Sequence, residues 1–145
     1  MNLTTRLLGT TLTLLAIAAP AHADVKPLNC TVDVNYRLIR LGQPGNAQTY
    51  SRAFTITPDT PYYEDFSTAL RIRDFFASMT PGAGATEVDI RYFSDVSVVV
   101  SVDFNARLTM AHNQKEGTIS GTHGFSSSQG VAGTHETSYT LTCLR

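Results

Sequence analysis

Two histidines recur in the same short tripeptide, and histidine is the side chain most often used to bind metals or carry protons near neutral pH. Gly121-Thr122-His123 and Gly133-Thr134-His135 flank a loop of small residues. If this loop is a hairpin centred near Gln129, the two imidazoles stand opposite each other, close enough to share a metal ion or a ligand. The alternative is a repeat produced by Thr- and Gly-rich strand ends, with both rings at the solvent-exposed rim.

Arg52 and Asp74 are charged residues at alternating positions that otherwise hold apolar side chains. Arg52 shares the parity of Tyr50 and Phe54, and Asp74 shares that of Leu70. Because buried charges need partners, one interpretation is an internal Arg52–Asp74 pair. A second is a polar ligand cavity that includes Arg52, His123 and His135. A third is a bulge that turns one or both side chains outward.

An acidic and aromatic segment lies between two prolines and the following strand. Pro58 and Pro61 precede Tyr62, Tyr63, Glu64 and Asp65. Tyrosine is enriched at the energetic centres of protein interfaces, and loops often carry function. We therefore interpret residues 62–65 as a partner-binding loop. The alternative is that the tyrosines fold back over the edge of the core.

The standard catalytic motifs are incomplete. His135-Glu136 lacks the second histidine of a zinc-protease helix, and Ser128 stands where a nucleophile elbow centred on Ser126 needs glycine. No glycine-rich phosphate loop follows an expected strand. We expect no enzymatic activity and no cofactor.

The strongest structural signal is alternation of apolar and polar residues, the period of a half-buried strand. From Val96 to Met110 nearly every second residue is apolar, which predicts one long strand that a bulge could bend. The same alternation covers residues 28–38, 88–92 and 139–143, and a further strand is expected over 47–56.

Residues 62–79 are ambiguous between helix and strand. Thr60 and Pro61 could cap and begin a helix. As a strand, the segment would turn Leu70 and Ile72 inward and Arg71 outward. We favour the strand and keep one short helix near 62–79 as the alternative.

Two cysteines lie near the two ends of the strand-forming region. Cys30 and Cys143 both fall on the apolar parity of their strands, so they face the same interior. In an oxidising compartment they would pair and bring the first and last strands together. Two separate free thiols are the alternative.

The first residues have the pattern of a cleavable signal peptide, residues 1–23. Arg6 precedes the uncharged apolar run Leu7 to Ala19, and Ala21-His22-Ala23 offers small residues for cleavage. The run is too short for a stable membrane anchor, although a retained anchor is the alternative. We expect a single mature β domain, residues 24–145, that is periplasmic or secreted.

Charge and pattern together define the expected class. The chain has 11 Lys and Arg against 12 Asp and Glu, without a basic cluster, which argues against a nucleic-acid partner. The alternating segments predict an all-β, antiparallel β-barrel or β-sandwich of about seven or eight strands, with the terminal strands linked by Cys30–Cys143.

Export, size and the missing catalytic motifs favour a non-enzymatic binding protein. The leading hypothesis is a periplasmic or secreted inhibitor or immunity-type protein whose partner is another exported protein. One alternative is a β-barrel carrier that binds a small ligand or a metal through His123, His135 and Arg52. A surface or structural subunit is the other alternative.

Overall fold

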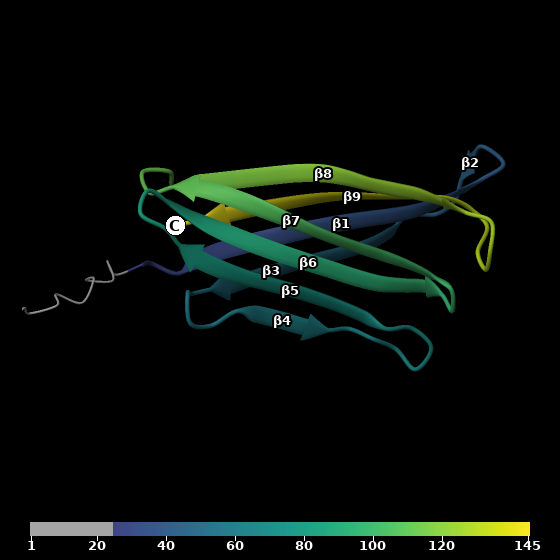
Figure 1. The fold of residues 1–145 in the computed structure, drawn as a ribbon, viewed down its shortest axis with the longest axis horizontal. Helices are drawn as coiled ribbons and strands as arrows, with labels where there is room; N and C mark the ends of the chain where they lie inside the picture. Colours follow the sequence, from purple (N-terminus) through teal and green to yellow (C-terminus); the bar gives the residue numbers. More distant parts are fainter. Residues whose placement is uncertain (1–24) are drawn as a thin grey trace, which may run out of the picture.

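The computed structural model describes residues 25–145, so the predicted signal peptide lies outside the described residues. These residues form two antiparallel sheets packed face to face, and no helix occurs among them (Figure 1). The same region contains no helix that could cross a membrane. The strands are β1 (Leu28–Arg40), β2 (Gln43–Pro44), β3 (Gln48–Ile56), β4 (Tyr62–Asp65), β5 (Arg73–Pro81), β6 (Ala85–Ser97), β7 (Val100–Ala111), β8 (Glu116–Ser127) and β9 (Gly133–Leu144).

The all-β prediction is confirmed, and of its two forms the structure is the sandwich. One sheet has the order β3-β1-β9-β8, with the short β2 pairing with the end of β1. The other sheet has the order β4-β5-β6-β7. The chain crosses between the sheets at the β3–β4 connection and again at the β7–β8 connection, so neighbouring elements in sequence remain neighbours in space.

Alternation in the sequence places the core between the sheets. On β1, Leu28, Cys30, Val32 and Val34 are buried, while the residues between them are exposed. β7 repeats the pattern, with Phe104 among its buried residues. Because successive side chains of a strand point to opposite faces, each strand contributes one apolar face to the same interior.

Aromatic rings connect the two sheets through this interior. Tyr139 of β9 stacks on Phe104 of β7 with ring centroids 4.7 Å apart, and Phe104 stacks on Tyr92 of β6 at 5.4 Å. Tyr92 in turn contacts Tyr50 of β3 at 5.7 Å. Aromatic pairs add to the free energy gained from burying their area, so this chain of rings holds the sheets together.

The predicted disulfide is confirmed. Cys30 and Cys143 are bonded and stand directly opposite each other on β1 and β9. The pairing of Asn29 with Leu144 continues the same register, so the two strands run side by side along most of their length. The bond therefore joins the first strand to the last at the position that alternation indicated.

The long strand predicted from Val96 is interrupted by a turn. β6 ends at Ser97, β7 begins at Val100, and these two residues pair across the hairpin. The register shifts between Asp95 and Ser97, and Val98, predicted to face inward, is 97% exposed. The apolar alternation continues through the turn without a break in period, so the pattern alone could not show where the chain reverses.

The segment 62–79 is extended, as favoured, but its inward face was predicted wrongly. Phe75 and Ala77 are fully buried, whereas Leu70 and Ile72 are 85% and 61% exposed. The reason is the tight connection 66–72, in which the Thr68 amide donates to the Arg71 carbonyl at 2.8 Å. Because of this turn, the alternation of inward and outward side chains counted over residues 70–72 does not continue into β5.

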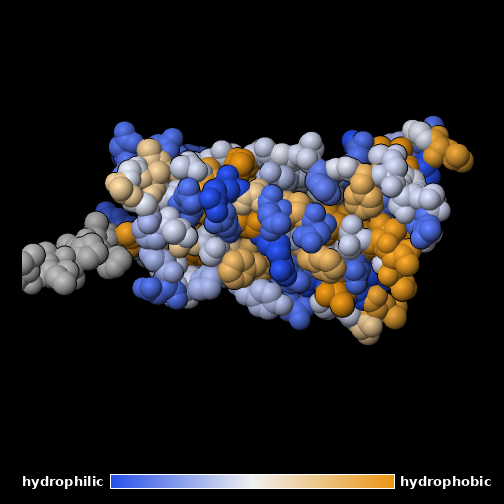
Figure 2. Space-filling model, viewed as in Figure 1, coloured by the Kyte–Doolittle hydropathy of each residue, from blue (hydrophilic) through white to orange (hydrophobic). Residues whose placement is uncertain are grey.

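One end of the sandwich carries exposed aliphatic side chains. Leu41, Leu70 and Val98 are at least 85% exposed. They lie in the β1–β2, β4–β5 and β6–β7 connections, at the end away from the C-terminus (Figure 1). Figure 2 shows hydrophobic surface gathered at this end. Contiguous exposed apolar surface of this kind often marks contact sites.

Candidate functional site

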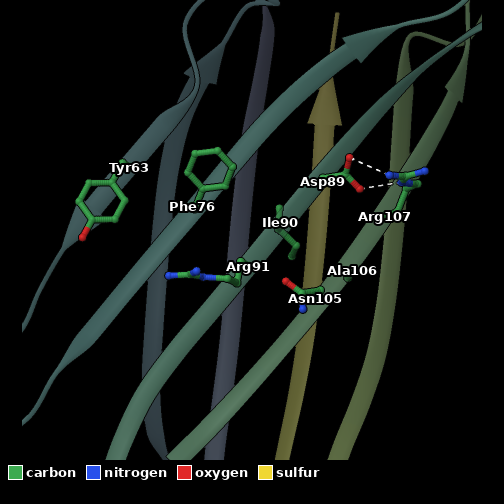
Figure 3. A pocket seen from close by; sticks show the side chains of 8 residues that line it. All are labelled: Tyr63, Phe76, Asp89, Ile90, Arg91, Asn105, Ala106 and Arg107. Atoms are coloured by element: carbon green, nitrogen blue, oxygen red, sulfur yellow. Dashed lines mark hydrogen bonds and ion pairs between the residues drawn. The ribbon is translucent and has the colours of Figure 1, made fainter.

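The outer face of the β4-β5-β6-β7 sheet holds a shallow groove of about 670 Å³. One row of side chains crosses all four strands: Tyr63 pairs with Phe76, Phe76 with Arg91, and Arg91 with Asn105. Each of these residues has outward parity on its strand, so the row stands on one surface. Figure 3 shows the two rings beside the Arg91 side chain.

Ion pairs fix the orientation of the two arginine side chains that line the groove. Arg107 binds Asp89 in a two-point contact, with Nε to Oδ1 at 2.6 Å and a terminal nitrogen to Oδ2 at 3.0 Å (Figure 3). Arg91 donates to Asp74 at 2.8 Å, and this hydrogen bond raises the pKa of the guanidinium. The groove thus combines apolar rings with charged groups of defined orientation.

Of the residues predicted to bind a partner, Tyr62 to Asp65, Tyr63 is the one that lines the groove. It is 60% exposed. Arg91, Asn105 and Arg107 fall between the apolar positions of the alternating segments, but alternation within a segment does not show that they share a surface with Tyr63. Phe76 was missed because Leu70 and Ile72 were expected to face inward. Continued alternation from them also turns Phe76 inward.

The predicted contact segment is a strand, not a loop, and its residues point in two directions. In β4, Tyr63 and Asp65 are exposed, while Tyr62 and Glu64 are partly buried. Tyr62 stacks on Phe54 with centroids 4.8 Å apart. Tyr62 thus packs over the core edge, which is the alternative stated for the tyrosines, and Tyr63 remains free to contact a partner.

Glu64 organises the polar contacts on the β3–β4 side. Its carboxylate accepts hydrogen bonds from the hydroxyls of Tyr50 and Tyr62 at 2.9 and 3.0 Å, and from Arg52 Nε at 2.8 Å. Burial, the largest single influence, raises the pKa of Glu64, but the three hydrogen bonds and the Arg52 charge outweigh it, and the pKa falls below its usual value.

Of the three interpretations of Arg52 and Asp74, the internal pair is wrong, and Asp74 is turned outward, as the third interpretation stated for one or both side chains. Arg52 pairs with Glu64, and Asp74 pairs with Arg91 on the outer face of the second sheet. Arg52 does have the inward parity that alternation indicated, but β3 is an edge strand. Its long side chain therefore reaches across the open side to β4.

The two histidines are not directly opposed. The β8–β9 hairpin pairs Phe125 with His135 and His123 with Thr137, which centres the loop at Gly130 and not at Gln129. Gly130 has a φ of 63°, a conformation that glycine adopts readily. The shift by one residue places the imidazoles diagonally on the sheet.

Their environments differ as well. His135 is fully buried and stacks on Phe125 with centroids 4.6 Å apart. Its Nε2 lies 3.0 Å from the Val131 carbonyl, and its Nδ1 lies 2.8 Å from the Tyr36 hydroxyl. A carbonyl only accepts, so Nε2 carries a proton and both ring nitrogens are engaged. His123 is exposed.

Within residues 25–145, no group of three or more His, Cys, Asp or Glu side chains could hold a metal ion. A neutral imidazole binds a metal through its free nitrogen lone pair. His135 uses that lone pair for Tyr36, so its arrangement serves packing.

A smaller cavity lies between the two sheets, on the same side as the Glu64 contacts. Its volume is about 160 Å³, and its lining includes Arg52, Arg73, Tyr92 and Ser94. Arg52 is the one residue of the predicted ligand set that lines it. Neither His123 nor His135 is among its lining residues.

The chain was compared with protein-family models, curated proteins and solved structures, and none of these comparisons finds a match.

Proposed function

We propose that this chain is an exported, non-enzymatic binding protein whose partner is another exported protein, and that the groove around Tyr63 is the contact surface. The observation that carries the proposal is the row of Tyr63, Phe76, Arg91 and Asn105 across four strands. Tyrosine and arginine are the residue types that most often dominate binding energy, and a rigid sheet positions them without loss of loop entropy.

The two ion pairs support this assignment. Arg107 and Arg91 are already held by Asp89 and Asp74, so a partner meets fixed charges and does not have to order long side chains. A small domain closed by a disulfide also suits an inhibitor or immunity-type protein, which presents a preformed surface outside the cytoplasm.

The test begins with affinity capture. The oxidised mature protein is the bait against extracts of exported proteins from the source organism, and a captured protein is then purified and titrated. We expect Tyr63→Ala to weaken the affinity of that complex by about tenfold or more, as for a hot-spot residue. Arg107→Gln should weaken it less, because the charge of Arg107 is already paired with Asp89.

Matched controls separate the groove from other surfaces. Arg37→Gln removes an exposed guanidinium paired with Glu136 on the opposite sheet, and it should leave affinity unchanged. Val98→Ser tests the exposed apolar end. If Val98→Ser weakens the complex and Tyr63→Ala does not, the contact surface is the loop end and the groove assignment fails. If no partner is captured, the binding-protein proposal itself loses its support.

A further inference from the structure

Arg73 differs from the paired arginines of this protein in having no partner. Arg37, Arg52, Arg91 and Arg107 each contact a carboxylate at 3.1 Å or less. Among residues 25–145, the Arg73 side chain makes no ion pair, and its Nε is buried without a hydrogen-bond partner. An unpaired buried donor is costly, so its position needs a reason.

The backbone holds Arg73 firmly at the start of β5. Its amide donates to Ser67 Oγ at 2.8 Å, and its carbonyl accepts from the Phe66 amide at 3.0 Å. The backbone of Arg73 is therefore fixed beside the cavity that this residue lines, and its Nε is left without a hydrogen-bond partner among residues 25–145.

The cavity that Arg73 lines has a positive charge balance. Arg52 lines the same space, and the carboxylate beside it is that of Glu64, which Arg52 already neutralises. The nearby Asp74 and Asp95 are engaged elsewhere, with Arg91 and with the Ile72 amide. Among the described residues that line the cavity, no carboxylate stands against the Arg73 guanidinium.

Polar groups suited to an anion lie around Arg73. Tyr92 and Ser94 bring hydroxyls, and Gln48 brings an amide. Ser94 is buried. Burial raises the pKa of Tyr92, while a hydrogen bond with Ser94 and the charge of Arg73 oppose that shift.

The remaining walls are apolar rings. Tyr50 stacks on Phe66 with centroids 4.5 Å apart and contacts Tyr92, and Val102 closes the space from β7. A cavity of about 150 Å³ can hold a molecule the size of benzene. The volume of about 160 Å³ therefore admits one small planar group together with its charged substituent at the opening.

We propose that this cavity binds a small organic monocarboxylate, with its carboxylate on the Arg73 guanidinium and its apolar body against Tyr50, Phe66 and Tyr92. Planar carboxylates match the forked donors of arginine, and the rings supply the apolar contact. The site lies between the sheets and is separate from the groove on the outer face, so it does not depend on the proposed protein partner.

The test uses benzoate as the probe on the oxidised protein, with benzamide as its neutral analogue and inorganic phosphate as an anion without an apolar body. Binding is followed by NMR chemical shifts. We expect benzoate to bind with a dissociation constant of about 1 mM or tighter, and benzamide about tenfold more weakly. The largest shifts should fall on Tyr92, Ser94 and Phe66.

Two variants test whether the Arg73 guanidinium binds the carboxylate of benzoate. Arg73→Gln should weaken benzoate binding about tenfold, the loss of one charge-assisted pair. Arg71→Gln is the matched control, because Arg71 lies two residues away and, among residues 25–145, its side chain hydrogen-bonds only to the Leu70 carbonyl. It should bind benzoate as the unmodified protein does.

Three outcomes overturn the proposal. Equal affinity for benzamide and benzoate would mean an apolar cavity without charge recognition, and tighter binding of phosphate would mean an anion site of another class. No shifts with benzoate at tens of times the protein concentration and up to about 10 mM would mean no site. The comparison of the three probes needs no variant, so it holds even if Arg73→Gln does not fold.

Discussion

Arg52 of β3 and Glu64 of β4 join the two sheets along one side of the sandwich, with Arg52 Nε 2.8 Å from both carboxylate oxygens. Glu64 Oε2 also accepts from the hydroxyls of Tyr50 and Tyr62. β3 and β4 belong to different sheets and are not hydrogen-bonded to each other as strands. These side-chain contacts therefore replace the missing backbone pairing on this side.

The stability of the fold should depend on the charge of Glu64. Its pKa is lowered in the folded protein, so the folded state binds fewer protons than the unfolded chain. The stabilisation is then present above the unfolded pKa and is lost as pH falls through the folded pKa. Glu64→Gln should lower the free energy of unfolding at pH 7 by about 1–2 kcal/mol and flatten its decline below about pH 5.

Urea denaturation at a series of pH values measures this dependence. Glu116→Gln is the control, because Glu116 is exposed at the start of β8 and should leave both stability and its pH profile unchanged. An unaltered acid profile in Glu64→Gln would show that other carboxylates govern acid unfolding.

His135 should act as a structural residue. It is fully buried, with both ring nitrogens engaged, so His135→Ala removes packing and leaves the Val131 carbonyl and the Tyr36 hydroxyl without partners. We expect a loss of about 2–4 kcal/mol in the free energy of unfolding. His123→Ala, at an exposed position on the neighbouring strand, should change it by less than about 0.5 kcal/mol.

Zinc calorimetry on the same proteins addresses the metal hypothesis. We expect no binding heat above background, because the two rings are diagonal and His135 has no free lone pair. Saturable heat that disappears in His123→Ala would restore the carrier hypothesis.

The Cys30–Cys143 bond should contribute much of the stability. It links residues separated by 113 positions, and in the loop-entropy description such a closure stabilises the fold by about 4–5 kcal/mol. The Cys30→Ser, Cys143→Ser double variant should therefore unfold at a clearly lower urea concentration than the oxidised protein. Coinciding midpoints would mean that the β1–β9 pairing alone keeps the ends together.

Gly121 should tolerate no side chain. A Cβ there would lie 2.5 Å from the Tyr139 hydroxyl oxygen, because the ring covers the glycine from the opposite strand. Gly121→Ala must displace Tyr139 from its stack with Phe104, at an expected cost of about 1–3 kcal/mol. Gly124→Ala on the same strand is the control, since the nearest atom to its Cβ is 3.4 Å away. Thermal unfolding that ranks the two variants equally would contradict this account.

Several features of the fold could be predicted because they depend on local period. The alternation around Cys30 and Cys143 predicted that both face the interior, and the structure pairs them directly. The strand over 88–92 follows the same rule, with Val88, Ile90 and Tyr92 buried. Period two is a property of the extended chain itself, so no distant contact is needed to recognise it.

The errors in assigning inward and outward side chains lie where a turn resets the parity. Leu70 and Val98 were assigned to the interior by counting through a reversal of the chain, and both are exposed. The hairpin at Gly130 was misplaced by one residue, which moved His123 from opposite His135 to opposite Thr137. A shift of one residue changes every cross-strand partner, and glycines and small residues permit several turn positions.

The sequence by itself determined an all-β interior, the disulfide and the outward faces of the strands, because these follow from alternation and cysteine parity. The tertiary structure alone decided which side chains of different strands meet. Sheet order placed Arg52 beside Glu64 and Asp74 beside Arg91, and it aligned Tyr63 with Asn105 across four strands. These strands follow one another along the chain, but their partners depend on the register of each strand pair and on how β3 packs beside β4, which the alternation of a single strand does not set.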